Sequence, residues 1–169
     1  AAVAFSRAGL REPELSGDDV ACLQYTGGTT GVSKGATLTH GNLAANVHQM
    51  NTWFAARIDR GHEIVITALP LYHVYALTCN CLAYVELGSL NVLITDPRDI
   101  RGFIAEIRRW KFTAITGVNT LYQHLANHPQ LKTVDFSSLK LVSAGGMAVT
   151  EATARQWACT QTNPAPPQS

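Results

Sequence analysis

The feature that most constrains this sequence is a repeated alternation between two kinds of segment. Short runs rich in β-branched and apolar residues favour strands, and longer segments with apolar residues at helical spacing favour helices. The strand-like runs lie at residues 20–25, 35–39, 63–69, 91–95, 112–116 and 139–143, and the helical segments at residues 40 to about 58, 77–87, 99–110 and 119–127. Because strands separated by helices pair in parallel, the alternation predicts an α/β fold with a mainly parallel sheet flanked by helices.

Both ends of the chain differ from this repeating part. Residues 1–18 are small and polar and include Pro13 and Gly17, so we expect an incoming linker. Residues 158–169, after Trp157, have no periodicity and hold three prolines among the last six positions, which predicts a disordered tail. The folded domain is therefore expected over residues 19–157, with Thr39 as the N-cap of its first helix.

Composition narrows the function classes. The 13 basic and 12 acidic residues give a net charge of +1, which argues against nucleic acid as a partner. Charged residues make up only 15% of the chain, below the usual share of about 25%, so we expect other parts of a protein to cover some of its surface. The apolar stretch 74–94 contains Asn80 and Glu86, which disfavours a membrane span. Four cysteines without a C-x-x-C pair indicate reduced thiols in the cytoplasm.

A loop rich in glycine and threonine follows the first predicted strand, which we expect to be buried. Its residues 26–35 comprise four glycines, three threonines, one serine, one lysine and one valine. Glycines allow successive backbone N–H groups to point toward one ligand, hydroxyls add hydrogen bonds, and lysine adds a positive charge. The loop is therefore predicted to bind a polyphosphate; a flexible surface turn is the alternative.

The loop differs from two better-known phosphate-binding motifs and matches a third motif of another kind. The Walker pattern fails because Ser33 precedes Lys34 and Gly35 follows it, and the glycine spacing does not match the dinucleotide-binding fingerprint. Residues 31–35 do match G-x-S-x-G, so a serine hydrolase with Ser33 as nucleophile stays open as an alternative. That motif requires a strand directly before it and a helix directly after it.

Residues 23–43, LQYTGGTTGVSKGATLTHGNL, closely resemble the AMP-binding loop of the adenylate-forming ligases, which include acyl-CoA synthetases, luciferases and peptide-synthetase adenylation domains. The segment LPLYHV at 69–74 resembles the next core motif of the same family. Three later segments resemble the bacterial long-chain fatty acyl-CoA synthetases in particular: DPRD at 96–99, TAITGVNT at 113–120 and SAGGM at 143–147. The resemblance covers about residues 19–157 and implies part of the large N-terminal domain of such an enzyme.

The resemblance implies a two-step reaction. A fatty acid carboxylate attacks the α-phosphate of ATP to give acyl-adenylate and pyrophosphate, and the thiol of coenzyme A then displaces AMP. Lys34 and His73 would be the catalytic residues, with Lys34 near the pyrophosphate and His73 beside the carboxylate, and the Thr26 hydroxyl would lie near Mg²⁺. The implied nucleotide-binding residues are Tyr25, Thr26, Gly27, Gly28, Thr29, Thr30, Gly31, Val32, Ser33, Lys34, Gly35, Ala36, Gly145, Gly146 and Met147.

Some of these positions also have simpler interpretations. His73 could serve as a helix-start histidine, and Gly145 and Gly146 could form an ordinary turn. The resemblance further places residues 117–119 on the acyl side of the site. Its implied partners are the small molecules ATP, fatty acid and coenzyme A, and it leaves room for peripheral contact with the inner membrane in the full-length enzyme.

Several motifs of the family are not found in this sequence, including Tyr-Gly-x-Thr-Glu and the C-terminal domain with its lysine. We therefore expect a truncated or frame-shifted segment that retains the phosphate loop. Each lost group would remove about 2–4 kcal/mol of transition-state stabilisation. The isolated chain should show no ATP–pyrophosphate exchange with palmitate, although a non-catalytic nucleotide-binding fragment would still bind ATP weakly.

Overall fold

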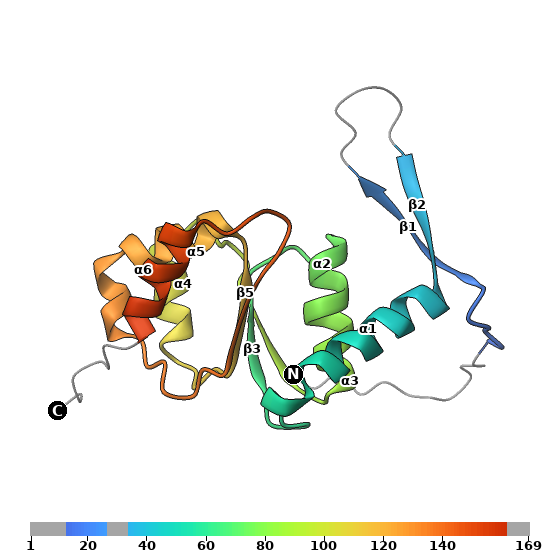
Figure 1. The fold of residues 1–169 in the computed structure, drawn as a ribbon, viewed down its shortest axis with the longest axis horizontal. Helices are drawn as coiled ribbons and strands as arrows, with labels where there is room; N and C mark the ends of the chain where they lie inside the picture. The colour runs from blue at the N-terminus through green and yellow to red at the C-terminus, as the bar shows by residue number, and fades with distance from the viewer. Residues whose placement is uncertain (1–12, 27–33, 162–169) are drawn as a thin grey trace. The chain divides into compact units, whose positions relative to one another are not determined.

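The computed structural model describes residues 13–26 and 34–161, and the chain divides into two units at residue 45. In the first unit, strand β1 (Val20–Thr26) pairs with strand β2 (Lys34–Thr39) as an antiparallel ribbon (Figure 1). Tyr25 lies opposite Gly35, where an added Cβ would approach the tyrosine ring to within 3.3 Å. The missing side chain of Gly35 therefore leaves room for this ring.

The prediction that residues 20–25 form a buried strand is wrong in one respect. These residues do form a strand, but Val20, Leu23 and Tyr25 are each more than half exposed. Apolar residues in a strand favour burial against a second layer of structure. A ribbon of two strands has no such layer within its own unit, so these side chains stay exposed.

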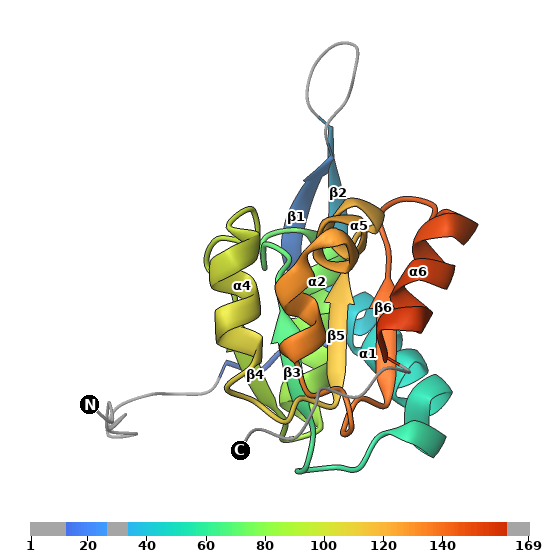
Figure 2. The ribbon, with the colours of Figure 1, turned by 90° about the vertical axis from the view of Figure 1, so that its left-hand side faces the viewer.

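The second unit contains a four-stranded parallel sheet, which confirms the predicted α/β class. Its strands are β3 (Ile64–Thr67), β4 (Leu90–Leu93), β5 (Ala114–Gly117) and β6 (Leu141–Ala144), in the order β4-β3-β5-β6 (Figure 2). Each strand comprises four residues and is shorter than its predicted run.

The helices form two layers around this sheet (Figure 1). One layer contains α4 (Ile100–Ile107), α5 (Asn119–Asn127) and α6 (Glu151–Gln161), with the short helix η3 (Pro129–Thr133) after α5. The other contains α2 (Val74–Ala76), the π-helical segment η2 (Leu77–Leu82) and α3 (Ala83–Glu86). Helix α1 (His40–Phe54) continues into the 3₁₀ turn η1 (Ala55–Arg57). Over the described ranges, none of these helices combines the length and the apolar character that crossing a bilayer requires.

Local signals place several helix ends correctly. The Thr39 hydroxyl accepts a hydrogen bond from the Asn42 N–H at 3.2 Å, and the Asn42 side chain accepts one from the Thr39 N–H at 3.1 Å, so Thr39 is the predicted N-cap. Gly88 adopts a φ of 70° after α3, a left-handed conformation that favours glycine at a helix end. Trp53, near the end of α1, is 84% exposed, whereas Val47 in the same helix is buried.

Apolar packing holds the sheet between its two helical layers. The larger cluster joins the sheet to α4, α5 and α6, with Phe103, Ile115 and Leu125 almost fully buried. A smaller cluster on the other face contains Val65, Tyr84 and two further buried side chains. Burying each large side chain stabilises the fold by about 1.5–3 kcal/mol.

A buried polar network crosses the sheet beneath the π-helical segment. Asn80, which is fully buried, donates from Nδ2 to Thr67 Oγ1 at 3.0 Å and to Thr116 Oγ1 at 2.7 Å. The Thr116 hydroxyl donates back to Asn80 Oδ1 at 2.9 Å, and Thr67 Oγ1 donates to Asn91 Oδ1 at 2.8 Å. The network therefore ties a helix to three adjacent strands of the sheet.

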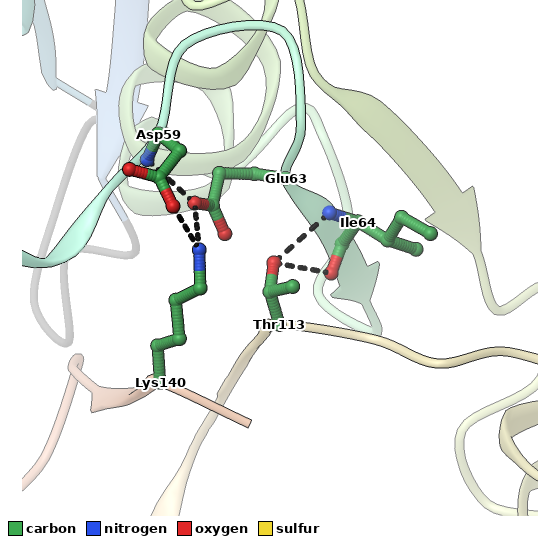
Figure 3. A network of polar contacts seen from close by, with 5 residues as sticks. All are labelled: Asp59, Glu63, Ile64, Thr113 and Lys140. Atoms are coloured by element: carbon green, nitrogen blue, oxygen red, sulfur yellow. Dashed lines mark hydrogen bonds and ion pairs between the residues drawn. The ribbon is translucent and has the colours of Figure 1, made fainter. Parts of the chain in front are cut away.

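A charged network lies at the opposite end of the strands (Figure 3). Lys140 Nζ lies 2.9 Å from Glu63 Oε1 and 2.7 Å from Asp59 Oδ2, and the Asp59 N–H donates to Glu63 Oε1 at 2.7 Å. Burial alone would raise the pKa of Glu63, but the Asp59 N–H, the Thr113 hydroxyl and the Lys140 ammonium together hold this pKa below its ordinary value. A hydrogen bond from Lys140 likewise lowers the pKa of Asp59.

These lowered pKa values predict an acid-sensitive contribution to folding. A carboxyl group with a lowered folded-state pKa stabilises the protein above its unfolded pKa of about 4, and this contribution is lost as the pH falls through the folded value. Urea unfolding should therefore give a midpoint that falls between pH 6 and pH 3, and less steeply in Lys140→Met than in the wild type. The same slope in both proteins would show that Lys140 does not cause it.

Candidate active site

The strand order creates a crevice at the carboxyl ends of the central strands. From β3 the chain passes to β4 on one side, and β5 then pairs on the other side of β3. Such a change of direction leaves the crevice above β3 and β5 open, and α/β folds commonly bind ligands there. A cavity of about 290 Å³ occupies this region; it is lined by Leu69, Pro70, Tyr72, His73, Tyr75, Val118, Thr120, Gly145, Gly146 and Met147. We call it the His73 cavity.

The turn after β3 positions His73. The His73 N–H donates to the Pro70 carbonyl at 3.0 Å, and His73 is the N-cap of α2, where its Nδ1 accepts from the Tyr75 N–H at 3.2 Å. Because Nδ1 is an acceptor, the neutral imidazole carries its proton on Nε2. His73 is thus both a helix-start histidine and a donor available at the cavity.

The end of β6 forms the facing wall. An added Cβ at Gly145 would lie 2.9 Å from Cζ of Tyr75, so the tyrosine ring occupies the space that a larger residue would need. Gly146 has a φ of 79°, which favours glycine. The ordinary-turn interpretation therefore accounts for Gly146, whereas Gly145 is required by a close approach of the Tyr75 ring.

Two tyrosine hydroxyls anchor β6 near the cavity. Tyr75 Oη lies 2.9 Å from Ser143 Oγ, within hydrogen-bond distance. Tyr122 Oη lies 2.7 Å from the Ser143 carbonyl and 3.2 Å from the Ile115 carbonyl, so it bridges β6 and β5. Burial raises the pKa of both phenols, which keeps them protonated near neutral pH.

The predicted residues divide between the two units. His73, Gly145, Gly146 and Met147 line one cavity although more than 70 positions separate the first from the others. Lys34, Gly35 and Ala36 are exposed residues of β2, whereas Tyr25 and Thr26 end β1. The remaining loop positions, Gly27, Gly28, Thr29, Thr30, Gly31, Val32 and Ser33, lie outside the described residues.

Sequence reasoning missed part of this cavity. Tyr72, Tyr75 and Thr120 line it and were not expected to. Tyr72 lies within the segment LPLYHV, and Tyr75 directly follows it. Their proximity to this motif is the sequence signal that could have identified them as cavity residues. Of residues 117–119, assigned to the acyl side, Val118 alone lines the cavity, while the Asn119 side chain accepts a hydrogen bond from the Thr150 N–H.

The structure contradicts the serine hydrolase alternative. The segment that begins at Lys34 is a strand paired with β1, whereas a nucleophile elbow leads directly into a helix. Within the described ranges, no three His, Cys, Asp or Glu side chains gather as a group that could hold a metal ion.

The fold and the cavity define an α/β domain with a ligand crevice at the change in strand direction. Residues 2–165 match the sequence profile of the AMP-binding enzyme family, and the chain belongs to that family. It is 54% identical over 146 residues to a long-chain-fatty-acid–CoA ligase of Escherichia coli O6:H1, covering 86% of this chain and 26% of that protein. The chain therefore spans about a quarter of this relative's length.

Solved structures agree with the fold. ATP-bound MatB from Rhodopseudomonas palustris superposes with a TM-score of 0.67 at 30% identity, covering 88% of this chain and 31% of MatB. A fatty acyl-adenylate ligase from L. pneumophila, in complex with acyl adenylate and pyrophosphate, gives a TM-score of 0.75 at 24% identity, covering 87% of this chain and 26% of that one. The second likeness concerns the fold alone.

Proposed function

We propose that residues 19–157 are part of the N-terminal domain of a long-chain fatty acid–CoA ligase. The observation that carries the proposal is the 54% identity to such a ligase over 86% of this chain, which includes the segments that line the His73 cavity. The apolar side chains among the lining residues suit a fatty acyl group, and His73 supplies a polar donor at the same cavity.

In this proposal the first step joins two anions. A carboxylate oxygen forms a bond to the α-phosphorus of ATP, and the bond from that phosphorus to the pyrophosphate oxygen breaks. Lys34 neutralises charge on the leaving pyrophosphate, and His73 donates from Nε2 to a carboxylate oxygen, which holds it in place. The thiolate of coenzyme A then bonds to the acyl carbon, and AMP leaves.

The same proposal covers the remaining components. Thr26 is the residue that would lie beside a Mg²⁺ ion bound with ATP, and that ion would reduce the charge of the phosphates. The partners are ATP, fatty acid and coenzyme A, and the whole enzyme works in the cytoplasm with peripheral contact to the inner membrane. The family and the names of the relatives support the choice of these small molecules as partners.

Binding of a stable acyl-adenylate mimic tests the proposal. Calorimetry with hexadecanoyl sulfamoyl-adenosine and its acetyl counterpart should show at least about tenfold tighter binding of the long-chain compound, because each buried methylene contributes about 0.8 kcal/mol. His73→Ala should weaken both, while His128→Ala, whose histidine does not line the cavity, should not. Equal affinities for the two compounds, or no binding of either, would contradict a long-chain acyl site.

Lys34 offers a separate test of the phosphate loop. Lys34→Ala is expected to weaken ATP binding about tenfold, since a charge-assisted contact to a phosphate contributes roughly 1.5–3 kcal/mol. Lys132→Ala is the matched control, because this exposed lysine lies in η3 of the other unit. Equal affinities of wild type and Lys34→Ala in calorimetric titrations would remove Lys34 from the nucleotide site.

A further inference from the structure

A second cavity adjoins the His73 cavity. It also has a volume of about 290 Å³ and lies at the carboxyl ends of β3, β4 and β5. The two cavities share Leu69, Pro70, Val118 and Thr120, so these four residues form a common wall. The second cavity differs by the presence of Arg98 and His124, and we call it the Arg98 cavity.

The basic side chains of the Arg98 cavity have no acidic partner among the described residues. No ion pair in those ranges includes Arg98 or His124. Two carboxylates lie close to Arg98 in the sequence, but both contact backbone donors. Asp96 Oδ1 accepts from the Arg98 N–H at 3.0 Å, and Asp99 Oδ1 accepts from the Gly102 N–H at 2.9 Å. The guanidinium is thus left to bind an anion from outside the chain.

The first turn of α5 adds backbone donors to this charge. Its N-cap, Val118, has an extended backbone and makes no side-chain capping bond. The Leu121 and Tyr122 N–H groups donate to the Val118 carbonyl, which leaves the Asn119 and Thr120 N–H groups as the donors of this turn. Such N–H groups at a helix start carry partial positive charge. Thr120, in this first turn, lines the cavity together with Arg98 and His124. Two basic side chains, one hydroxyl and a helix N-terminus therefore meet beside an apolar wall.

We infer that the Arg98 cavity binds a phosphate group of a small ligand, with Arg98 as its cationic contact and His124 as a further hydrogen-bonding side chain. Arginine is suited to this because its planar donors match phosphate oxygens in pairs. Two ligands could supply this phosphate group. One is coenzyme A, whose pantetheine arm could extend past the shared wall toward the His73 cavity, and the other is free pyrophosphate. The inference rests on the proposed function only in the choice of coenzyme A and pyrophosphate as the ligands that supply the phosphate.

Titrations of the full chain in a Lys34→Ala background test the inference without interference from the phosphate loop. The probes are coenzyme A, sodium pyrophosphate and pantetheine, which lacks phosphate. Arg98→Gln should weaken at least one phosphate-bearing probe about tenfold and leave pantetheine unchanged. Arg101→Gln, on the exposed surface of α4, is the matched control and should change no affinity more than about twofold. Urea unfolding should give the same midpoint for both glutamine variants.

The pattern of affinities identifies the source. Arg98-sensitive binding of coenzyme A with weak binding of pyrophosphate supports a phosphate ester on an arm, and equal Arg98-sensitive binding of both supports free phosphate. The inference is overturned if no probe loses affinity in Arg98→Gln, or if Arg101→Gln causes the same loss. Both of these contrary results are compatible with normal binding of the acyl-adenylate mimic in the His73 cavity. Failure of the Arg98 inference is therefore distinguishable from failure of the proposed function.

Discussion

Asn80→Leu is expected to lower the free energy of unfolding by about 3 kcal/mol, because it leaves a buried hydroxyl without its partner. Leucine has the same branching and the same number of side-chain heavy atoms as asparagine, so we attribute the loss mainly to the hydrogen bonds. Thr116 would lose both its donor and its acceptor, whereas Thr67 would keep its bond to Asn91. Urea unfolding at pH 7 measures the change.

A compensating substitution makes this prediction specific. Replacing both partners of a buried hydrogen bond with apolar groups of similar shape costs far less than replacing one. Asn80→Leu/Thr116→Val should therefore recover more than half of the lost stability. If the double variant is less stable than Asn80→Leu, the network is not the cause of the loss, and altered packing of the π-helical segment is responsible.

Gly145→Ala is expected to weaken binding of the long-chain acyl-adenylate mimic by more than tenfold. The new methyl group would lie 2.9 Å from Cζ and 3.0 Å from Cε2 of Tyr75, closer than side chains pack, so the ring or the end of β6 must move. Both line the His73 cavity, and overpacking of this kind costs about 1–3 kcal/mol. Calorimetry measures the affinity, and urea unfolding measures the accompanying loss of stability.

Shortening the opposing side chain tests the cause. Tyr75→Leu removes the ring atoms that the Gly145 methyl group would meet. Gly145→Ala/Tyr75→Leu should therefore bind the mimic more tightly than Gly145→Ala alone. Wild-type affinity in Gly145→Ala, or no recovery in the double variant, would show that close packing between Gly145 and Tyr75 does not shape the cavity.

Much of the local structure was predictable from residue patterns. The alternation of segments predicted the α/β class, Thr39 caps the helix that it was predicted to cap, and the motif around His73 pointed to a cavity residue. Such features depend on interactions between residues a few positions apart, which a sequence displays directly. The prediction for the loop between Thr26 and Lys34 stays a prediction.

Only the tertiary structure decided which distant residues meet. It set the strand order β4-β3-β5-β6 and placed Gly145 against Tyr75. It also buried Asn80 between η2 and the sheet, and it brought Arg98 and His124 to one cavity. It also showed that Val20, Leu23 and Tyr25 are exposed, although an apolar strand suggests burial. The sequence predicted most of the strands and helices, because backbone preferences and periodicity are local. The exception is α6, which was not predicted and which extends into the segment expected to be a disordered tail. The packing of those segments depends on side-chain fit between distant positions, which no local pattern records.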